Sequence, residues 1–509
     1  MGDKKNISSL LWKLVVVACF VIIIVLFARW IAYFKTGAEE QEIFNKTLIE
    51  RAVHQPQITW TSNDQPHGAE LDVYAKEEIE QAYAEAWHVL NNSIKNNKNI
   101  GLEDRYSLEL VEEIESDLPK NSTLLNKQID LSHNLELHLL SYNRQLISFT
   151  DKEARIKKRI STEDGLIIHE SDELTNFQIV MELSDGKWKI TSWVKTRQAT
   201  TPPQVEPVNE AITSAITGVN YYPKNYPWFE FWENYSNEIV ASDIDKAKKL
   251  GLNTFRVFIP YEQFGASVIQ DSMIAKVENF LDLMEEREMQ VALTLFDFPS
   301  SYSIDNYTAK TNHLRRLVTE FGNHPVIKLW DIKNELDLDF QHYGKKTCLD
   351  WLGLMIDQAR TIKPDIKLTV GWSSPEHATL YKNSLDVISF HYYKESSELK
   401  SWLKKLKSTC NNKPLLLGEF GLSTYDPWYF PFGHSEDEQA SHAKEILKIL
   451  QKNQVSNYLY WTLNDFEDID SKVVGWKPWV KNVQMEFGIY DLNEKEKAVA
   501  KIFKEHNSR

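Results

Sequence analysis

Short apolar runs recur about eight times between residue 213 and the C-terminus, and segments with helical periodicity separate most of them. The runs are almost continuously apolar, which is typical of strands that are buried on both faces of a parallel sheet. The eight expected strands are 215–222, 254–260, 291–297, 327–335, 366–372, 387–393, 414–420 and 457–463. Eight such strands predict an α/β fold, a (β/α)8 TIM barrel over residues 213–509. A doubly wound sheet is the alternative, but no glycine-rich phosphate-binding turn follows any strand.

Seven helices are expected between these strands. Their ranges are 242–251, 277–289, 312–321, 349–362, 399–406, 436–450 and 494–506. Ser242 is the expected N-cap of the first, because Ile244, Ala247 and Leu250 then lie on one face. The connection after the fifth strand is short, and no helix is expected there.

Residues 71–197 carry a different pattern, with helices first and strands afterwards. A helix is predicted from Lys76, where apolar side chains recur at steps of three and four residues, and a second over 102–114. Alternating segments then predict strands at 135–142, 144–150, 177–183 and 187–194. Asp185-Gly186 is a hairpin turn signal between the last two. A Pro/Thr-rich linker over 198–212, with Pro202-Pro203, separates this region from the barrel.

This order of elements, which ends in DGKWKITSW, resembles the cone-shaped α+β fold of nuclear transport factor 2. That fold carries both enzymes and binding modules, so the resemblance implies little about function. No convergent Asp/His pair is evident. The histidines of the region are interpreted as surface or packing residues; they are His88, His133, His138 and His169.

The N-terminus predicts a membrane anchor over residues 1–38, followed by a linker over 39–70. Residues 14–28 are uncharged and would rise about 22 Å as a helix, against a bilayer core of about 30 Å. Lys13 and Arg29 can reach the interface, where Trp12 and Trp30 would act as anchors. The result would be a single-pass membrane protein.

A cleaved signal peptide is the alternative, because its apolar region would have a similar length. Thr36-Gly37-Ala38 offers only a poor cleavage site. Lys4 and Lys5 favour a cytoplasmic N-terminus. The barrel would then lie outside the cytoplasm, in the periplasm or the extracellular space.

Composition narrows the class of protein. The formal net charge of −15 argues against a nucleic-acid partner, whose phosphates require a basic surface. Aromatic residues make up 12% of the chain, with 16 Trp, and carbohydrate binding is one use of such rings. Cys19 lies in the apolar N-terminal run, so at most one disulfide is expected, between Cys348 and Cys410.

Chemistry in a barrel of this kind lies at the carboxyl ends of the strands. Glu335 ends the fourth strand and Glu419 the seventh, so the two carboxylates would face each other across the barrel end. Cleavage of a glycosidic bond needs such a pair. Asp331 fits less well, because it would lie about 13 Å deeper along the strand, and Asp337 lies beyond the strand.

Two motifs of the barrel region resemble those of a known enzyme family. FGNHPVIKLWDIKNELD (321–337) resembles the fourth-strand motif of clan A glycoside hydrolases, and PLLLGEFG (414–421) is similar to their seventh-strand motif. The joint set is most similar to glycoside hydrolase family 5, the cellulases and mannanases. The residues of that set are Arg256, Asn334, Glu335, His391, Tyr393, Glu419 and Trp461.

The resemblance implies a role for each residue of the set and requires no metal or organic cofactor. Glu335 would be the general acid/base and Glu419 the nucleophile of a retaining double displacement. Asn334 would bind the sugar 2-hydroxyl. Arg256 would keep Glu419 ionised, and Tyr393 would donate a hydrogen bond to Glu419. His391 would contact either the sugar or the acid/base residue. Trp461 would lie beneath the bound sugar.

Asp297 departs from this pattern. The family often has a histidine at or after the third strand, whereas this chain reads LFDFPSSY over 295–302. The sugar-contact pattern, and with it the substrate, therefore stays open.

Aromatic residues of the loops after the strands are further candidates for sugar binding, since tryptophan faces stack on sugar rings. They are Trp228, Trp372, Trp428 and Trp476. The sequence thus predicts a membrane-anchored glycosidase that cleaves a β-linked oligo- or polysaccharide of glucan or mannan type. The alternatives are a catalytically silent carbohydrate-binding scaffold, and a transglycosylase that uses the same site. The middle domain would hold the barrel away from the bilayer or bind a partner in an envelope polysaccharide system.

Overall fold

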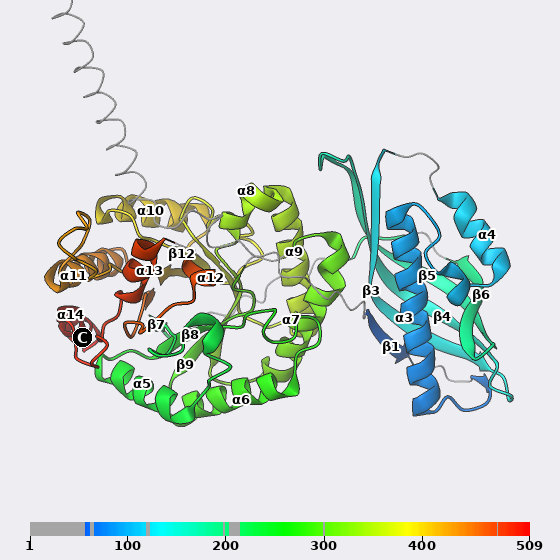
Figure 1. Ribbon diagram of the computed structural model, residues 1–509, viewed down its shortest axis with the longest axis horizontal. Helices are drawn as coiled ribbons and strands as arrows, with labels where there is room; N and C mark the ends of the chain where they lie inside the picture. The colour runs from blue at the N-terminus through cyan, green and yellow to red at the C-terminus, as the bar shows by residue number, and fades with distance from the viewer. Residues whose placement is uncertain are drawn as a thin grey trace, which may run out of the picture.

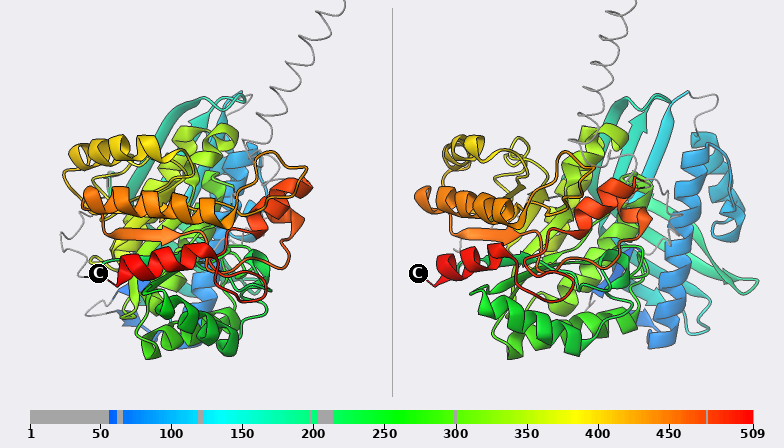
Figure 2. Two further views of the ribbon diagram at one scale, coloured as in Figure 1. Left: turned by 90° about the vertical axis from the view of Figure 1, so that its left-hand side faces the viewer. Right: turned by 60° about the vertical axis from the view of Figure 1, so that its left-hand side comes forward.

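The computed structural model describes residues 56–61, 66–118, 123–196, 199–202, 214–298, 301–475 and 477–508. They form a barrel and a smaller α+β domain that lie against each other (Figure 1, Figure 2). The predicted anchor (1–38) lies outside the described residues, as does most of the linker predicted at 198–212. Within the described residues, no helix combines the length and the apolar character needed to cross a bilayer.

Eight parallel strands close into a barrel, which confirms the predicted (β/α)8 fold. In order around the barrel they are β7 (Thr217–Asn220), β8 (Thr254–Phe258), β9 (Gln290–Thr294), β10 (Ile327–Asn334), β11 (Leu368–Trp372), β12 (Ile388–His391), β13 (Leu415–Glu419) and β14 (Asn457–Tyr460), with β14 pairing with β7. Each overlaps a predicted strand. Their carboxyl ends meet at one end of the barrel.

Helices surround the barrel at the predicted places. The long ones are α5 (Asn237–Lys249), α6 (Asp271–Glu286), α7 (Tyr307–Phe321), α9 (Lys345–Ile362), α10 (Ser396–Thr409), α11 (Glu436–Lys452) and α14 (Ala498–Asn507). The shorter ones are η2 (Trp228–Glu230), η3 (Ile304–Asn306), η4 (Leu336–Asp339), α8 (Phe340–Tyr343), α12 (Ser471–Val474) and α13 (Pro478–Met485). The described residues between β11 and β12 contain no helix, as predicted.

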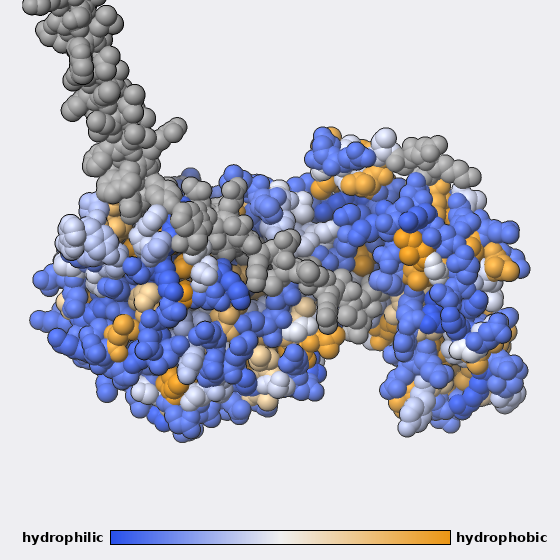
Figure 3. Space-filling model, in the orientation of Figure 1, coloured by the Kyte–Doolittle hydropathy of each residue, from blue (hydrophilic) through white to orange (hydrophobic). Residues whose placement is uncertain are grey.

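Two local predictions about the barrel are wrong. The N-cap of α5 is Ser236, whose hydroxyl accepts from the Ile239 N–H, so Ser242 lies inside the helix. Cys348 and Cys410 are buried free thiols and form no disulfide with each other. Buried side chains fill the space between strands and helices, and the face of the molecule in Figure 3 is mainly hydrophilic over the described residues.

The smaller domain packs helices on one sheet. Its elements are β1 (Gln57–Thr61), β2 (His67–Gly68), α3 (Val73–Asn96), η1 (Leu102–Asp104), α4 (Leu108–Asp117), β3 (Leu125–Leu140), β4 (Leu146–Ser161), β5 (Ile167–Ser184) and β6 (Lys187–Lys195). The strand order is β1-β3-β4-β5-β6, with β2 also on β3, and β3 to β6 are antiparallel. Asp185 and Gly186 both have positive φ, as the predicted two-residue hairpin between β5 and β6 requires.

Strands β1 and β2 correct the prediction that residues 39–70 are entirely a linker. Both pair with β3 in parallel, and Trp60 of β1 packs against the core of this domain. The sheet therefore begins within the region assigned to the linker.

His133 corrects a second prediction, that this domain contains no convergent Asp/His pair. Its Nδ1 lies 2.6 Å from Asp151 Oδ2 and its Nε2 lies 3.0 Å from Asp130 Oδ2, and all three side chains are fully buried. The antiparallel register of β3 and β4 brings these residues together. Burial lowers the pKa of the imidazole, but Asp151 and Asp130 outweigh it and raise the pKa to about 9.

The sheet and the barrel share a packed and ion-paired boundary. Ile129 and Leu131 of β3 belong to the same apolar cluster as the barrel residues. Arg155 of β4 donates to Asp357 of α9 at 2.6 Å, and Arg159 donates to Asp350 at 3.3 Å. The ion pairs tie α9 to the sheet, and α7 contacts β3; both helices lie on the side of the barrel that faces the sheet (Figure 1).

Candidate active site

The guanidinium of Arg256 lies at the centre of the polar groups at the carboxyl ends of the strands. Its Nη1 donates to Glu419 Oε1 at 2.7 Å and to Asn220 Oδ1 at 2.8 Å. Its Nη2 donates to Asp331 Oδ2 at 2.6 Å and to Asn334 Oδ1 at 2.9 Å. One buried cation therefore joins strands β7, β8, β10 and β13.

Glu419 ends β13, and its side chain is 8% exposed. Tyr393 donates its hydroxyl to Glu419 Oε2 at 2.9 Å, while Arg256 holds the other oxygen. Burial raises the pKa of the Glu419 carboxyl, whereas His391, Arg256 and the Tyr393 hydrogen bond act to lower it. Both hydrogen-bond donors favour the carboxylate form.

Glu335 directly follows β10 in a left-handed backbone conformation with φ 50°. Non-glycine residues rarely adopt this region, and those that do are concentrated at functional sites. The Glu335 N–H donates to the Gly371 carbonyl at 2.6 Å. Its side chain is 25% exposed, and its Oε1 lies 2.7 Å from His391 Nδ1. Burial and then the nearby Asp337 carboxylate raise the pKa of Glu335 to about 7.

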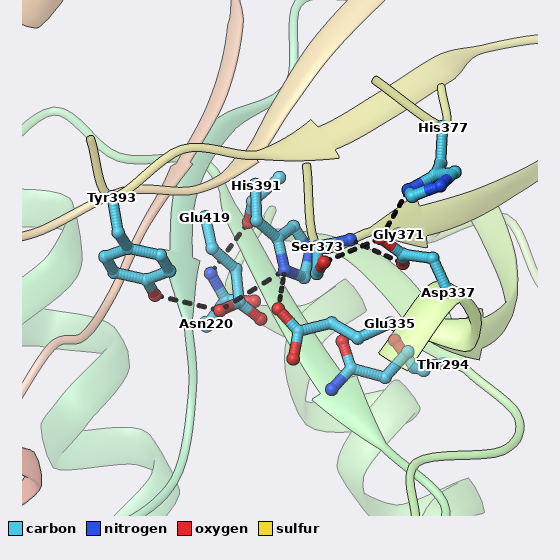
Figure 4. Close-up of polar contacts among 12 residues, drawn as sticks. Asn220, Thr294, Glu335, Asp337, Gly371, Ser373, His377, His391, Tyr393 and Glu419 are labelled. Carbon is cyan, nitrogen blue, oxygen red and sulfur yellow. Dashed lines mark hydrogen bonds and ion pairs between the residues drawn. The ribbon is translucent and has the colours of Figure 1, made fainter. Parts of the chain in front are cut away.

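The two carboxyl groups converge, as the sequence predicts. A carboxylate oxygen of Glu335 and one of Glu419 lie within 4.8 Å of each other and of a His391 ring nitrogen. Figure 4 shows Tyr393, Glu419, His391 and Glu335 side by side. Burial lowers the pKa of His391 to about 4, so the imidazole is neutral at pH 7.

Asn334 lies between Arg256 and Asp297. Its Oδ1 accepts from Arg256, and its Nδ2 donates to Asp297 Oδ1 at 3.1 Å. Asp297 is 7% exposed, and its Oδ2 accepts from the Tyr222 hydroxyl at 3.2 Å. Burial raises the pKa of Asp297 to about 6.

Two of the predicted tryptophans meet at this end of the barrel. The rings of Trp228 and Trp461 lie 5.5 Å apart between centroids, and Tyr222 stacks on Trp228 at 5.2 Å. Trp228 is 8% exposed and Trp461 is 7% exposed. They form one aromatic wall together with Phe466, which lies 5.1 Å from Trp228.

Of the other three predicted tryptophans, the two that the structure describes are not brought to the site. Trp372 is fully buried and packs against Phe340 and His377, which corrects its assignment to sugar binding. Strand alternation is the reason, because Gly371 faces the barrel interior and Trp372 therefore faces outward. Trp428 is 96% exposed, and its ring lies edge-on to that of Tyr429, 5.7 Å away between centroids. Trp476 lies outside the described residues.

Several polar residues outside the predicted set of site residues complete the arrangement. Asp331 contacts Arg256, and its Oδ1 accepts from the Gly371 N–H at 3.0 Å. Asn220 also donates to the Gly418 carbonyl at 2.9 Å. Asp337 accepts from the Ser373 N–H and hydroxyl and lies 3.0 Å from His377 Nδ1. The position of Asn220 at the end of β7 was the available signal for that residue, whereas Asp331 lies inside β10.

Two groups among the described residues have donor atoms close enough to hold a metal ion. Glu335, His391 and Glu419 are one, but the Arg256 guanidinium on Glu419 opposes a second cation there. Asp282, Glu285 and His324 on the surface are the other. Neither group is needed for the chemistry argued below.

Gly371 is predicted to be essential for this packing. A Cβ at this position would lie 2.9 Å from Arg256 Nη2, 3.0 Å from His391 Nε2 and 3.2 Å from Asp331 Oδ2. Gly371→Ala should therefore lower the free energy of unfolding by about 3 kcal/mol, since it separates buried charges, as measured by urea denaturation. Gly165→Ala is the control, because a Cβ there meets nothing within 4 Å and only its φ of +87° is unfavourable, by about 1 kcal/mol. Equal losses in the two variants would contradict the expected crowding.

Comparisons with known proteins identify the family. Residues 209–467 match the family model described as Cellulase (glycosyl hydrolase family 5). No curated protein matches the chain. The solved structures that resemble it include an exo-β-1,4-mannosidase from Opitutaceae bacterium strain TAV5, with 20% identity, a TM-score of 0.47, and coverage of 57% of this chain and 58% of that one.

Two further structures resemble it at similar distance. A GH5_18 protein from Streptomyces cattleya in complex with GlcNAc has 17% identity and a TM-score of 0.48, with 58% of this chain and 80% of that chain covered. The endo-β-1,4-mannanase from Thermotoga petrophila has 13% identity and a TM-score of 0.43, with 58% and 76% covered. At these low identities and TM-scores, the solved structures give no information on the substrate or the mechanism of this protein. The family match, however, spans just over half of the chain, and the protein belongs to glycosyl hydrolase family 5.

Proposed function

We propose that this glycosidase hydrolyses β-linked glycans of glucan or mannan type with retention of configuration at the anomeric carbon. The observation that supports retention is the approach of Glu335 and Glu419 to within 4.8 Å between carboxylate oxygens. Retaining enzymes have carboxyl groups about 5–5.5 Å apart, whereas inverting enzymes leave about 6.5–9.5 Å for a water molecule.

In the first step, a carboxylate oxygen of Glu419 attacks the anomeric carbon and the bond to the glycosidic oxygen breaks. Glu335 gives its proton to that oxygen, so the leaving sugar departs as an alcohol. The pKa of about 7 keeps a useful fraction of Glu335 protonated at neutral pH. Arg256 and Tyr393 stabilise the Glu419 carboxylate until it attacks.

In the second step, water replaces Glu419 at the anomeric carbon. The Glu335 carboxylate takes a proton from this water while its oxygen bonds to carbon and the Glu419 ester bond breaks. Both carboxyl groups then return to their starting forms. Asn334, which precedes Glu335 and accepts from Arg256, binds the sugar 2-hydroxyl, and the wall of Trp228 and Trp461 faces the sugar ring.

Replacement of the two carboxyl groups tests this assignment. Glu419→Gln should abolish hydrolysis, because the amide cannot form the glycosyl ester. Glu335→Gln should slow cleavage of a β-glucan or β-mannan oligosaccharide by about 10²–10⁴-fold, and slow an aryl glycoside with a good leaving group much less. Product analysis on a panel of β-glucans and mannans, with NMR of the first anomer released, gives the readout.

The outcomes separate the alternatives. First products with the β-configuration, together with the loss of activity in Glu419→Gln and Glu335→Gln, support the proposal. First products with the α-configuration would overturn retention. Longer oligosaccharides in place of free sugar would indicate transglycosylation. Oligosaccharide binding without turnover in the wild type would indicate a scaffold.

The pH profile provides a second test. Glu335 acts as an acid while protonated, so kcat/KM should fall as the pH rises through about 7. Asp337 raises this pKa by like-charge repulsion, so Asp337→Asn should move the basic limb to lower pH by about 0.5–1 unit. Asp365→Asn, on the surface, is the matched control. An unchanged or upward-shifted limb in Asp337→Asn would contradict the assignment of Glu335.

We also propose, from the sequence, that residues 1–38 anchor the protein in a membrane with the barrel outside the cytoplasm. The middle domain, in which the α-helices α3 and α4 precede the long strands β3 to β6, is proposed to be a nuclear transport factor 2-like domain that can engage an envelope polysaccharide system. Deletion of residues 1–38 should release the full activity from the membrane fraction after cell lysis and sedimentation. Sedimentation of the deleted protein with membranes would contradict the anchor.

A further inference from the structure

Asp297 touches both halves of the candidate site, and it stands where the family often has a histidine. On one side it contacts Asn334, which belongs to the group around Arg256. On the other side it contacts Tyr222, which stacks under the tryptophan wall. The mechanism above uses neither the carboxylate nor this link.

The contacts of Asn334 fix the orientation of its amide. Nδ2 donates to Asp297 Oδ1, and Oδ1 accepts from Arg256 Nη2. A flipped amide would place its NH2 against the guanidinium and its oxygen against the carboxylate, and both contacts would be repulsive. With Asp297 ionised, the second N–H of Nδ2 remains available to a sugar hydroxyl.

The contact with Tyr222 connects Asp297 to the aromatic wall of Trp228 and Trp461. The Tyr222 ring is held between Trp228, at 5.2 Å, and Phe258, at 5.3 Å between centroids. Its hydroxyl is the donor to Asp297 Oδ2. Asp297 therefore sets the separation between Asn334 and the tryptophan wall.

Asp297 is a carboxylate without a close cation. Among the described residues, no Lys, Arg or His nitrogen lies within 4.0 Å of its carboxylate oxygens. Lys333 donates instead to the backbone carbonyl of Asp297 at 2.7 Å. The groups that face it are Tyr222, Asn334, Lys333 and Arg256. Burial raises its pKa to about 6, against the opposing charges of Lys333 and Arg256.

We propose that Asp297 is a positioning residue that holds the Asn334 amide with its N–H toward the sugar 2-hydroxyl, at a fixed distance from the Trp228–Trp461 wall. The inference rests on the proposed function, because it assumes that Asn334 binds the 2-hydroxyl. Contacts to this hydroxyl strengthen in the transition state of glycoside cleavage. The loss of Asp297 should therefore affect kcat/KM for sugars that carry the 2-hydroxyl.

The experiment compares an aryl β-glycoside with its 2-deoxy analogue, in the full-length protein. Asp297→Asn should lower kcat/KM for the 2-hydroxy substrate by about 10- to 100-fold, the effect of one charged hydrogen bond. For the 2-deoxy substrate the loss should be less than about threefold, because the group that Asn334 binds is absent. The double variant with Asn334→Ala should be no worse than Asn334→Ala alone.

Asp243→Asn is the control. Asp243 is 3% exposed and also accepts from a tyrosine and an asparagine, Tyr221 at 3.1 Å and Asn464 at 3.1 Å, and in addition from Lys246 at 3.0 Å. Its replacement weakens a buried Tyr/Asn/Asp cluster of the same kind and also the pair with Lys246, so its cost in stability is at least comparable. It should lower stability without changing the ratio of the two substrates.

A second test uses only the wild-type protein, so it does not depend on whether a variant folds. The Asp297 carboxylate is lost as the pH falls through about 6, so kcat/KM for the 2-hydroxy substrate should fall there more steeply than for the 2-deoxy substrate. Equal losses for both substrates in Asp297→Asn, together with parallel acid limbs, would overturn the inference. Failure of the proposed function would look different, since neither substrate would be cleaved or Glu335→Gln and Glu419→Gln would retain activity.

Discussion

The site depends on one buried cation. Arg256 is 2% exposed and balances two carboxylates, Asp331 and Glu419, while it also orients Asn220 and Asn334. Removal of a buried charge from such a set costs about 3–5 kcal/mol, since its partners are left uncompensated. Lysine could not replace it, because an ammonium group lacks the planar fork that reaches four side chains in fixed directions. The face of Phe258, 4.6 Å from the guanidinium carbon, supports it from one side.

The positions of the two glutamates followed from the sequence because the carboxyl ends of parallel strands must meet at one end of a barrel. Contacts that depend on side-chain length did not follow. Asp331 was judged too deep along β10 to matter, yet the long Arg256 side chain reaches it and Glu419 at once. Trp372 was misassigned because the strand end alone does not say which face a residue occupies. The neighbouring Gly371 is the clue, since a side chain there would strike Arg256 and His391.

The middle domain shows a different limit. Its long helix and its hairpin were predictable from local periodicity and from one turn. The β1 strand was not, because it is short and pairs with β3 across more than seventy residues of chain. The contacts of His133 depend on another register, that of β3 with β4, which places Asp151 of β4 beside it. Local patterns carry no information about such pairings.

The boundary between the two folded parts has an evolutionary consequence. Because Ile129 and Leu131 complete the apolar cluster of the barrel, and Arg155 and Arg159 find acidic partners on α9, the sheet is not an independent module strung on a tether. A barrel without the sheet would expose the apolar surface that Ile129 and Leu131 cover, and Asp357 would lose Arg155. Separation of the barrel from the sheet by gene rearrangement would therefore call for polar substitutions on this side of the barrel.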